Sequence, residues 1–251
     1  MKIFPIGTSR LHEPLTLIDE TLVEFPRMGY FHSTSQILDC LKIITGDITL
    51  TAEQAKLFFR KDQVECNKFD LDLWTDNFCA SVDRIRQQFE NADTLFIEIS
   101  AHRSYKLNNL HIQGNPNYYQ DVSYADIWKD GYYQKYMPAL NVLDYEDTDL
   151  LIDNLISIDE ILLENEKKAI IFGHLVNSSN PNKLRLKTNT SLQQALKQIN
   201  TTTLIWYDQT HLVDQFGFRV LDNGTVDIHH LPWDGLYIFI DELIELANFK
   251  D

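Results

Sequence analysis

Four short apolar runs, each followed by small or polar residues, constrain the fold of this chain more than any other feature. They are Lys2–Ile6, Thr94–Ile99, Ala169–Phe172 and Thr203–Tyr207. Runs that are apolar almost throughout, rather than at alternate positions, are typical of strands covered on both faces, as in a parallel sheet. Helical patterns between the runs supply the crossovers, and we expect helices at Ser33–Ile44, Thr51–Lys61, Asp72–Asn91, Ser157–Glu166, Ser191–Gln198 and Leu236–Asn248. This alternation predicts a doubly wound α/β domain.

The length of the chain and one irregular segment set the domain organisation. At 251 residues, 44% of them hydrophobic, the chain is long enough for one large domain with a sizeable core. Residues 105–145 break the pattern, because they are rich in tyrosine and asparagine. We therefore expect a single domain over residues 1–251 with a loop-rich Tyr/Asn insertion at 105–145. Such an insertion suits a lid or a sugar-binding loop, and a surface loop with tyrosines packed on the core is an equal alternative.

The net charge and the cysteine content indicate which binding partners and which cellular compartment to expect. The formal net charge is −15, with 37 acidic residues against 22 basic ones. Such a surface repels phosphate backbones and anionic lipids, so we expect no nucleic-acid binding and no membrane insertion. The odd number of cysteines, Cys40, Cys66 and Cys79, argues against a disulfide framework. With no signal-peptide pattern and no apolar run near 20 residues, the sequence predicts a cytoplasmic protein.

Polar residues follow the predicted strands at the edge where parallel sheets hold their ligands. They are Ser9, His102, Arg103, His174 and Asp208. A metal site at this edge is disfavoured, because the histidines show no H-x-H or H-x-x-x-H spacing. The alternative for each of these residues is structural: a turn or helix-capping serine, a surface ion pair for the arginine, and a satisfied loop or core position for each histidine.

A serine and an Asp-x-x-His pair at opposite ends of the chain carry the chemical hypothesis. Ser9 comes in a Gly-x-Ser turn after the first strand, and Asp227 precedes His230 by three positions just before the last helix. An imidazole oriented by a carboxylate can take the proton of a serine hydroxyl. His229 is a rival base, and Asp208 with His211 forms a second Asp-x-x-His pair.

These two blocks resemble the first and last blocks of the SGNH/GDSL hydrolase superfamily. Thr8 stands where the family has Asp, and Arg10 where it has Leu. The resemblance implies a three-layer α/β/α, flavodoxin-like domain with a central, mainly parallel sheet. It also implies Ser9 as nucleophile, His230 as base and Asp227 as its partner. Candidates for oxyanion stabilisation or substrate binding are Gly29, His32, Ser33, His102, Arg103 and His174.

The resemblance favours a serine-dependent enzyme that acts on O-acetyl groups of a carbohydrate, as an esterase or as an O-acetyltransferase, with surface-polysaccharide assembly as a context. Hydrolysis would require no cofactor, whereas a transferase would take acetyl-CoA as donor. An alternative is a non-catalytic protein of the same fold that binds an anionic ligand such as CoA or a nucleotide sugar. A nucleotide-binding domain without ester chemistry ranks last, because the sequence has no G-x-G-x-x-G or Walker A pattern.

Overall fold

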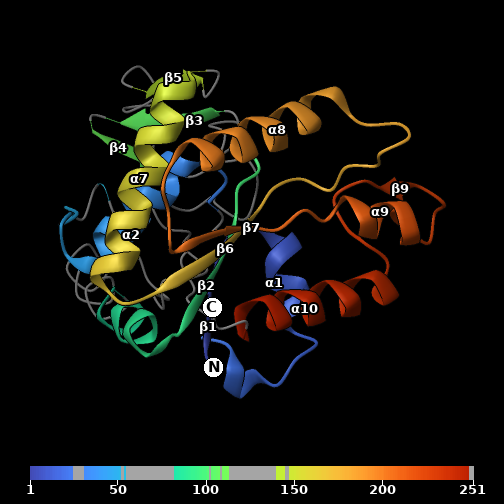
Figure 1. The fold of residues 1–251 in the computed structure, drawn as a ribbon, viewed down its shortest axis with the longest axis horizontal. Coiled ribbons are helices and arrows are strands. Elements are labelled where there is room, and N and C mark those ends of the chain that lie inside the picture. The colour runs from blue at the N-terminus through green and yellow to red at the C-terminus, as the bar shows by residue number, and fades with distance from the viewer. Residues whose placement is uncertain are drawn as a thin grey trace, which may run out of the picture.

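The computed structural model describes residues 1–24, 31–51, 54, 82–101, 103–107, 109–112, 140–144 and 147–248 (Figure 1). At its centre is a parallel sheet of four strands, β1 (Ile3–Ile6), β2 (Thr94–Glu98), β6 (Lys168–Phe172) and β7 (Leu204–Trp206). They lie in the order β1-β2-β6-β7, and every neighbouring pair is parallel. All four predicted strands are therefore confirmed, with starts and ends that differ from the prediction by at most one residue.

The outer edge of β1 carries one further parallel contact. Val23 forms an isolated bridge with Ile3, and the backbone N–H of Glu24 donates to the carbonyl of Ile3 at 2.8 Å. This segment follows β1 in the chain but lies on the outer side of β1. Across the sheet the order is therefore the Val23 segment, β1, β2, β6 and β7, so the second segment of the chain precedes the first. That is the flavodoxin-like order, in which ligands bind at the carboxyl ends of the strands, where the strand order reverses.

Helices cover both faces of the sheet (Figure 1). One hydrophobic core lies beneath α2 (Thr34–Thr45), α7 (Thr148–Glu164) and α8 (Lys183–Gln198). A second core lies beneath α1 (Ser9–Leu15), α9 (Thr210–Phe216) and α10 (Trp233–Asn248). Successive residues of β2 alternate between them, because Leu95 and Ile97 enter the first core and Phe96 the second. The three-layer α/β/α prediction is thus confirmed.

The predicted helices differ from the observed ones mainly at their N-termini. α7 and α8 begin nine and eight residues earlier than predicted, at Thr148 and Lys183. Their true caps are Asp147 and Asn182, whose side chains accept from the first-turn N–H groups. The short helices α1 and α9 were not predicted. Of the helix predicted at Asp72–Asn91, residues 82–91 are helical, and the rest lies outside the described residues, as does nearly all of Thr51–Lys61.

Smaller elements complete the described fold. β3 (Arg103–Leu107), β4 (Leu110–Ile112) and β5 (Leu140–Asp144) form an antiparallel sheet in the order β4-β3-β5. These strands occupy the described part of the predicted insertion at 105–145, while residues 113–139 lie outside the described part, so the insertion stays a prediction. β8 (Arg219–Val220) and β9 (Val226–Asp227) form a hairpin, and a 3₁₀ turn, η1, spans Glu20–Leu22.

Candidate active site

The structure brings Ser9, His230 and Asp227 into one chain of contacts. Ser9 Oγ lies 3.2 Å from His230 Nε2, and His230 Nδ1 lies 2.6 Å from Asp227 Oδ2. Both distances are within hydrogen-bonding range. The serine, histidine and carboxylate therefore have the order and contacts of a Ser-His-Asp triad, although 221 positions separate the serine from the histidine.

The tight turn from β1 into α1 positions Ser9. It is the first residue of α1, and Thr8 is the cap that precedes it. A Cβ at Gly7 would stand only 2.7 Å from the Cβ of Glu98, so any side chain there would push β1 away from β2. Glycine is required because the backbone itself approaches Glu98 this closely.

The turn after β9 fixes the other two side chains. Asp227 Oδ1 accepts from the backbone N–H of His229 at 2.9 Å, while Oδ2 faces the imidazole of His230. Partial burial opposes ionisation of Asp227, yet these hydrogen bonds hold its pKa below the usual range. A carboxylate that stays ionised can keep the Nδ1 proton on its side of the ring and leave Nε2 free to accept from Ser9.

Glu98 is the buried anion of the site, and the sequence interpretation missed it. Its side chain is fully buried at the carboxyl end of β2. Oε2 accepts from the Thr8 N–H at 2.8 Å and from the Thr8 hydroxyl at 2.6 Å, and Oε1 pairs with the guanidinium of Arg10. A charged residue inside an otherwise apolar strand was the available signal, because unpaired carboxylates are almost never fully buried.

Arg10 links this anion to His174. One guanidinium nitrogen lies 2.9 Å from His174 Nδ1, and the backbone N–H of His174 donates to Asn189 Oδ1 at 2.8 Å. His174 follows β6 by two residues, as predicted, and it borders the site through Arg10.

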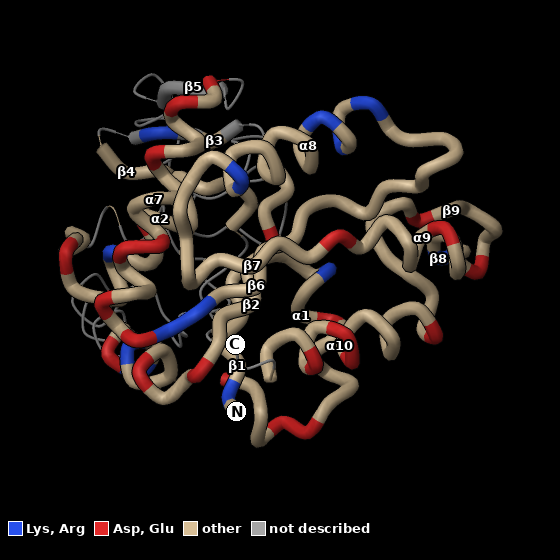
Figure 2. The backbone as a smooth tube through the Cα atoms, viewed as in Figure 1, with Lys and Arg blue, Asp and Glu red and all other residues tan. Residues whose placement is uncertain are grey.

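Arg185 contacts His229, so the two adjacent histidines have different partners. This arginine of α8 is only 7% exposed; it donates to the carbonyl of Ile228 at 2.5 Å and lies 3.0 Å from His229 Nδ1. Burial, together with the charges of Arg185 and Arg10, lowers the pKa of His229. His230, and not the rival His229, contacts Ser9. Figure 2 marks basic residues on α8 and acidic residues on α10.

The second Asp-x-x-His pair lies on another part of this edge. His211 Nε2 pairs with Glu242 of α10 at 2.9 Å, and its Nδ1 lies 3.1 Å from the carbonyl of Asp208. The Asp208 carboxylate accepts from Thr210. These contacts stabilise the start of α9 and its packing on α10.

The remaining predicted site residues are not brought to Ser9 by any described contact. Ser33 is fully buried and caps α2 by accepting from the N–H of Gln36 at 3.3 Å. His32 Nδ1 lies 3.3 Å from the hydroxyl of Ser100, and burial lowers the pKa of His32 although Glu98 opposes the shift. Gly29 and His102 lie outside the described residues, and Arg103 is described only as the first backbone position of β3.

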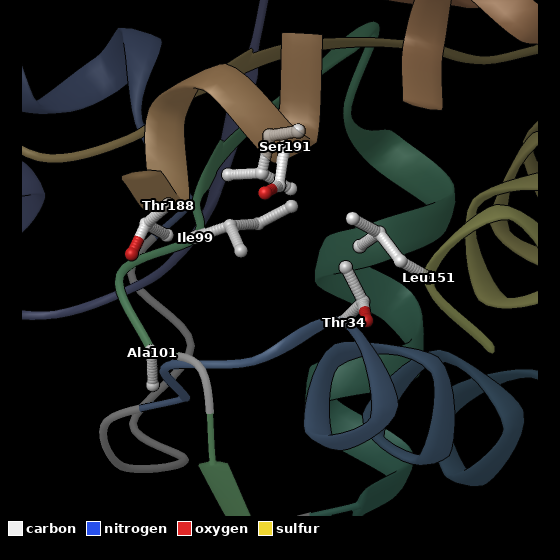
Figure 3. A pocket seen from close by; sticks show the side chains of 7 residues that line it. Thr34, Ile99, Ala101, Leu151, Thr188 and Ser191 are labelled. Carbon is white, nitrogen blue, oxygen red and sulfur yellow. The ribbon is translucent and has the colours of Figure 1, made fainter. Parts of the chain in front are cut away.

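Two cavities share Leu175, and the smaller of them is lined by His230 of the triad. A small one of about 10 Å³ is lined by Arg10, His230 and Leu175, among others. A larger one of about 310 Å³ shares Leu175 and is lined by Arg185, Phe218 and Ile228, and also by Val176, Asn177, Asn180, Pro181 and Asn182. A third, again about 10 Å³, lies between β2, α2, α7 and α8, where Thr34, Ile99, Leu151 and Thr188 surround it (Figure 3). Of these three cavities, which are lined by described residues, only the larger one has room for more than a water molecule.

The described residues contain no group of three or more histidine, cysteine or acidic side chains placed to hold a metal ion. Cys40, the one cysteine among them, is buried in the core as a free thiol. In the same part of the chain, no helix combines the length and apolar character needed to cross a bilayer.

Fold and site together define a three-layer α/β/α protein with a serine, a histidine and an aspartate in contact at the carboxyl edge of its sheet. The chain belongs to the TviD N-terminal domain family, whose model matches residues 1–141. This match includes Ser9 and Glu98 and ends before Asp227 and His230. No curated protein matches the chain.

Proposed function

We propose that this protein is a serine-dependent acyl-ester enzyme of the SGNH type that acts on O-acetyl groups of a carbohydrate. The observation that carries the proposal is the contact of Ser9 with His230 and of His230 with Asp227. The family match supports the polysaccharide context, because TviD is a Vi antigen O-acetyltransferase. We propose O-acetyl transfer in polysaccharide assembly as the first activity to test and hydrolysis as the second.

The proposed reaction runs in two steps through Ser9. The hydroxyl oxygen attacks the acyl carbonyl while its proton passes to His230 Nε2, and Asp227 stabilises the imidazolium through Nδ1. The leaving group takes that proton, and the acetyl group stays on Ser9. In the second step His230 takes a proton from the acceptor hydroxyl, whose oxygen attacks the acetyl-serine, and the departing Ser9 oxygen takes that proton back from His230 Nε2. Water as acceptor gives an esterase, and a sugar hydroxyl gives a transferase with acetyl-CoA as the proposed donor.

Stabilisation of the tetrahedral oxyanion falls to groups beside Ser9. The N–H of Ser9 is in the first turn of α1, where backbone N–H groups have no partner within the helix. Arg10 follows Ser9 in the chain, and its guanidinium is held by Glu98 and His174. A backbone donor and a fixed cation are the kind of preorganised groups that stabilise developing negative charge.

A second candidate function is the binding of an anionic ligand without turnover. Arg10 and Arg185 are both held at this edge of the sheet, in a chain of net charge −15, and Arg185 lines the cavity of about 310 Å³. Arg185 in the wall of a ligand-sized cavity and Arg10 in the wall of a small cavity that shares Leu175 with it suit the phosphates of CoA or of a nucleotide sugar.

A fluorophosphonate probe separates the two functions. We expect the probe to label Ser9 in the native protein, as located by peptide mass spectrometry, and labelling to fall at least 100-fold in His230→Ala. His211→Ala is the matched control, because His211 contacts Glu242 rather than Ser9, and it should label at the native rate. A folded protein that resists the probe but binds CoA would support the binding function and overturn the enzyme proposal.

A further inference from the structure

A carboxylate that the proposed mechanism does not use lies beside the base. Glu13 follows Ser9 by one helical turn on α1, so the two side chains share one face of the helix. Its Oε2 lies 3.9 Å from His230 Nε2, on the same side of the imidazole as Ser9 Oγ. An acceptor hydroxyl that approaches Nε2 must therefore pass close to Glu13.

Arg219 holds this carboxylate in a fixed orientation. Its two terminal nitrogens donate to the two oxygens of Glu13 at 2.8 and 3.0 Å. Its Nε donates to the carbonyl of Leu231 at 3.1 Å, and its backbone N–H to that of His230 at 2.9 Å. A guanidinium has five N–H groups, so these bonds leave two for a ligand. Both side chains are partly exposed, at 19% for Arg219 and 27% for Glu13.

The same guanidinium stacks on an exposed tryptophan. The Arg219 Cζ lies 5.2 Å from the centre of the Trp233 ring, which is within the range of a cation–π contact. Trp233 opens α10, three positions after His230, and the residue is 53% exposed. α1 and α10 lie on the same face of the sheet (Figure 1), so Glu13, Arg219 and Trp233 form a continuous surface that begins at the base.

We propose that Glu13, Arg219 and Trp233 form a subsite that holds a pyranose ring of the carbohydrate substrate beside His230. The free area of the indole would take the apolar C–H face of the sugar, because the negative π face attracts weakly positive C–H groups. The Glu13 carboxylate would accept from one hydroxyl, and Arg219 would donate to a second. An exposed aromatic ring next to a fixed acceptor and donor matches a sugar better than an anion, because the charges of Glu13 and Arg219 cancel.

This inference rests on the proposed function only for its role in the reaction, and its test does not need turnover. Ser9→Ala protein would be applied to an array of hexose, hexosamine and hexuronate oligosaccharides. The strongest ligand would then be titrated by calorimetry into Ser9→Ala alone and into the same protein with a second substitution. We expect Trp233→Ala to weaken this binding at least tenfold, Glu13→Ala to weaken it by a similar factor, and Trp233→Phe to retain most of it.

Leu163→Ala is the matched control, because Leu163 is likewise an exposed apolar residue, on α7, and it should bind as the parent does. Thermal melting would verify that each variant is folded. Binding unchanged in Trp233→Ala, or no oligosaccharide bound by folded parent protein, would overturn the subsite. Binding that depends on Trp233 in a protein whose native form resists the fluorophosphonate would support the subsite and overturn only the proposed chemistry.

Discussion

At the scale of single residues, the Glu98–Arg10 pair is the electrostatic centre of the site. It is buried, and it anchors the turn that presents Ser9 through Thr8. Removing one member of a buried pair leaves the other charge uncompensated, whereas removing both costs much less. The two charges therefore stabilise the site as a unit.

We expect Glu98→Gln to lower the free energy of unfolding by about 3 kcal/mol, because Arg10 keeps a buried charge without its partner. Urea denaturation of Glu98→Gln, Arg10→Met and the double variant would measure the coupling. The double variant should lose clearly less than the two single losses combined. Strictly additive losses would contradict a coupled pair.

At the scale of elements, the caps decide where helices begin and which polar residues reach the site. Ser33 was a candidate for the oxyanion hole, but in the structure its hydroxyl caps α2. We expect Ser33→Ala to cost about 1 kcal/mol in the free energy of unfolding, the usual value of an N-cap. The rate of probe labelling at Ser9 should stay within twofold of native, and a labelling rate lowered tenfold in stable protein would return Ser33 to the catalytic site.

The sequence predicted the elements with strong local patterns and missed those that depend on tertiary contacts. All four parallel strands were recognisable, because a buried strand is apolar on both faces. The starts of α7 and α8 were missed, because Ser157 and Ser191, which lie inside these helices, were taken as their first residues, whereas the caps are Asp147 and Asn182. For the site, Ser9, Asp227 and His230 could be proposed from short motifs, whereas Glu98, Glu13 and Arg219 act through partners that only the folded chain brings near.

At the scale of the whole molecule, several histidines make stability depend on pH. Burial lowers the pKa of His12, His32 and His229, and the negative charge of Glu98 opposes the shift for the first two. The unfolded chain therefore binds protons at these sites at a higher pH than the folded one does. Their contribution to stability is complete above the ordinary histidine pKa, near 6.5, and it decreases as pH falls through the lower folded pKa values.

We accordingly expect the free energy of unfolding to be smaller at pH 5.5 than at pH 7.5, as measured by urea denaturation at constant ionic strength. His32→Gln should reduce this difference, because it removes one of the groups that take up a proton on unfolding. Exposed His211, which pairs with Glu242, offers a control substitution that leaves those three groups intact. A stability that rises on acidification over this interval would contradict the assignment.

Because Ser9 and His230 lie far apart along the chain, the protein could be divided into two fragments that form the triad only when they reassemble. The exposed stretch of Ser178 to Asn180, between β6 and α8, divides the sequence into a part that carries the serine and a part that carries the histidine and aspartate. Neither piece alone would possess a reactive serine. Co-expressed pieces cut there would report their own reassembly by regaining the probe signal, so the chain could serve as a split reporter for the proximity of two proteins fused to its halves.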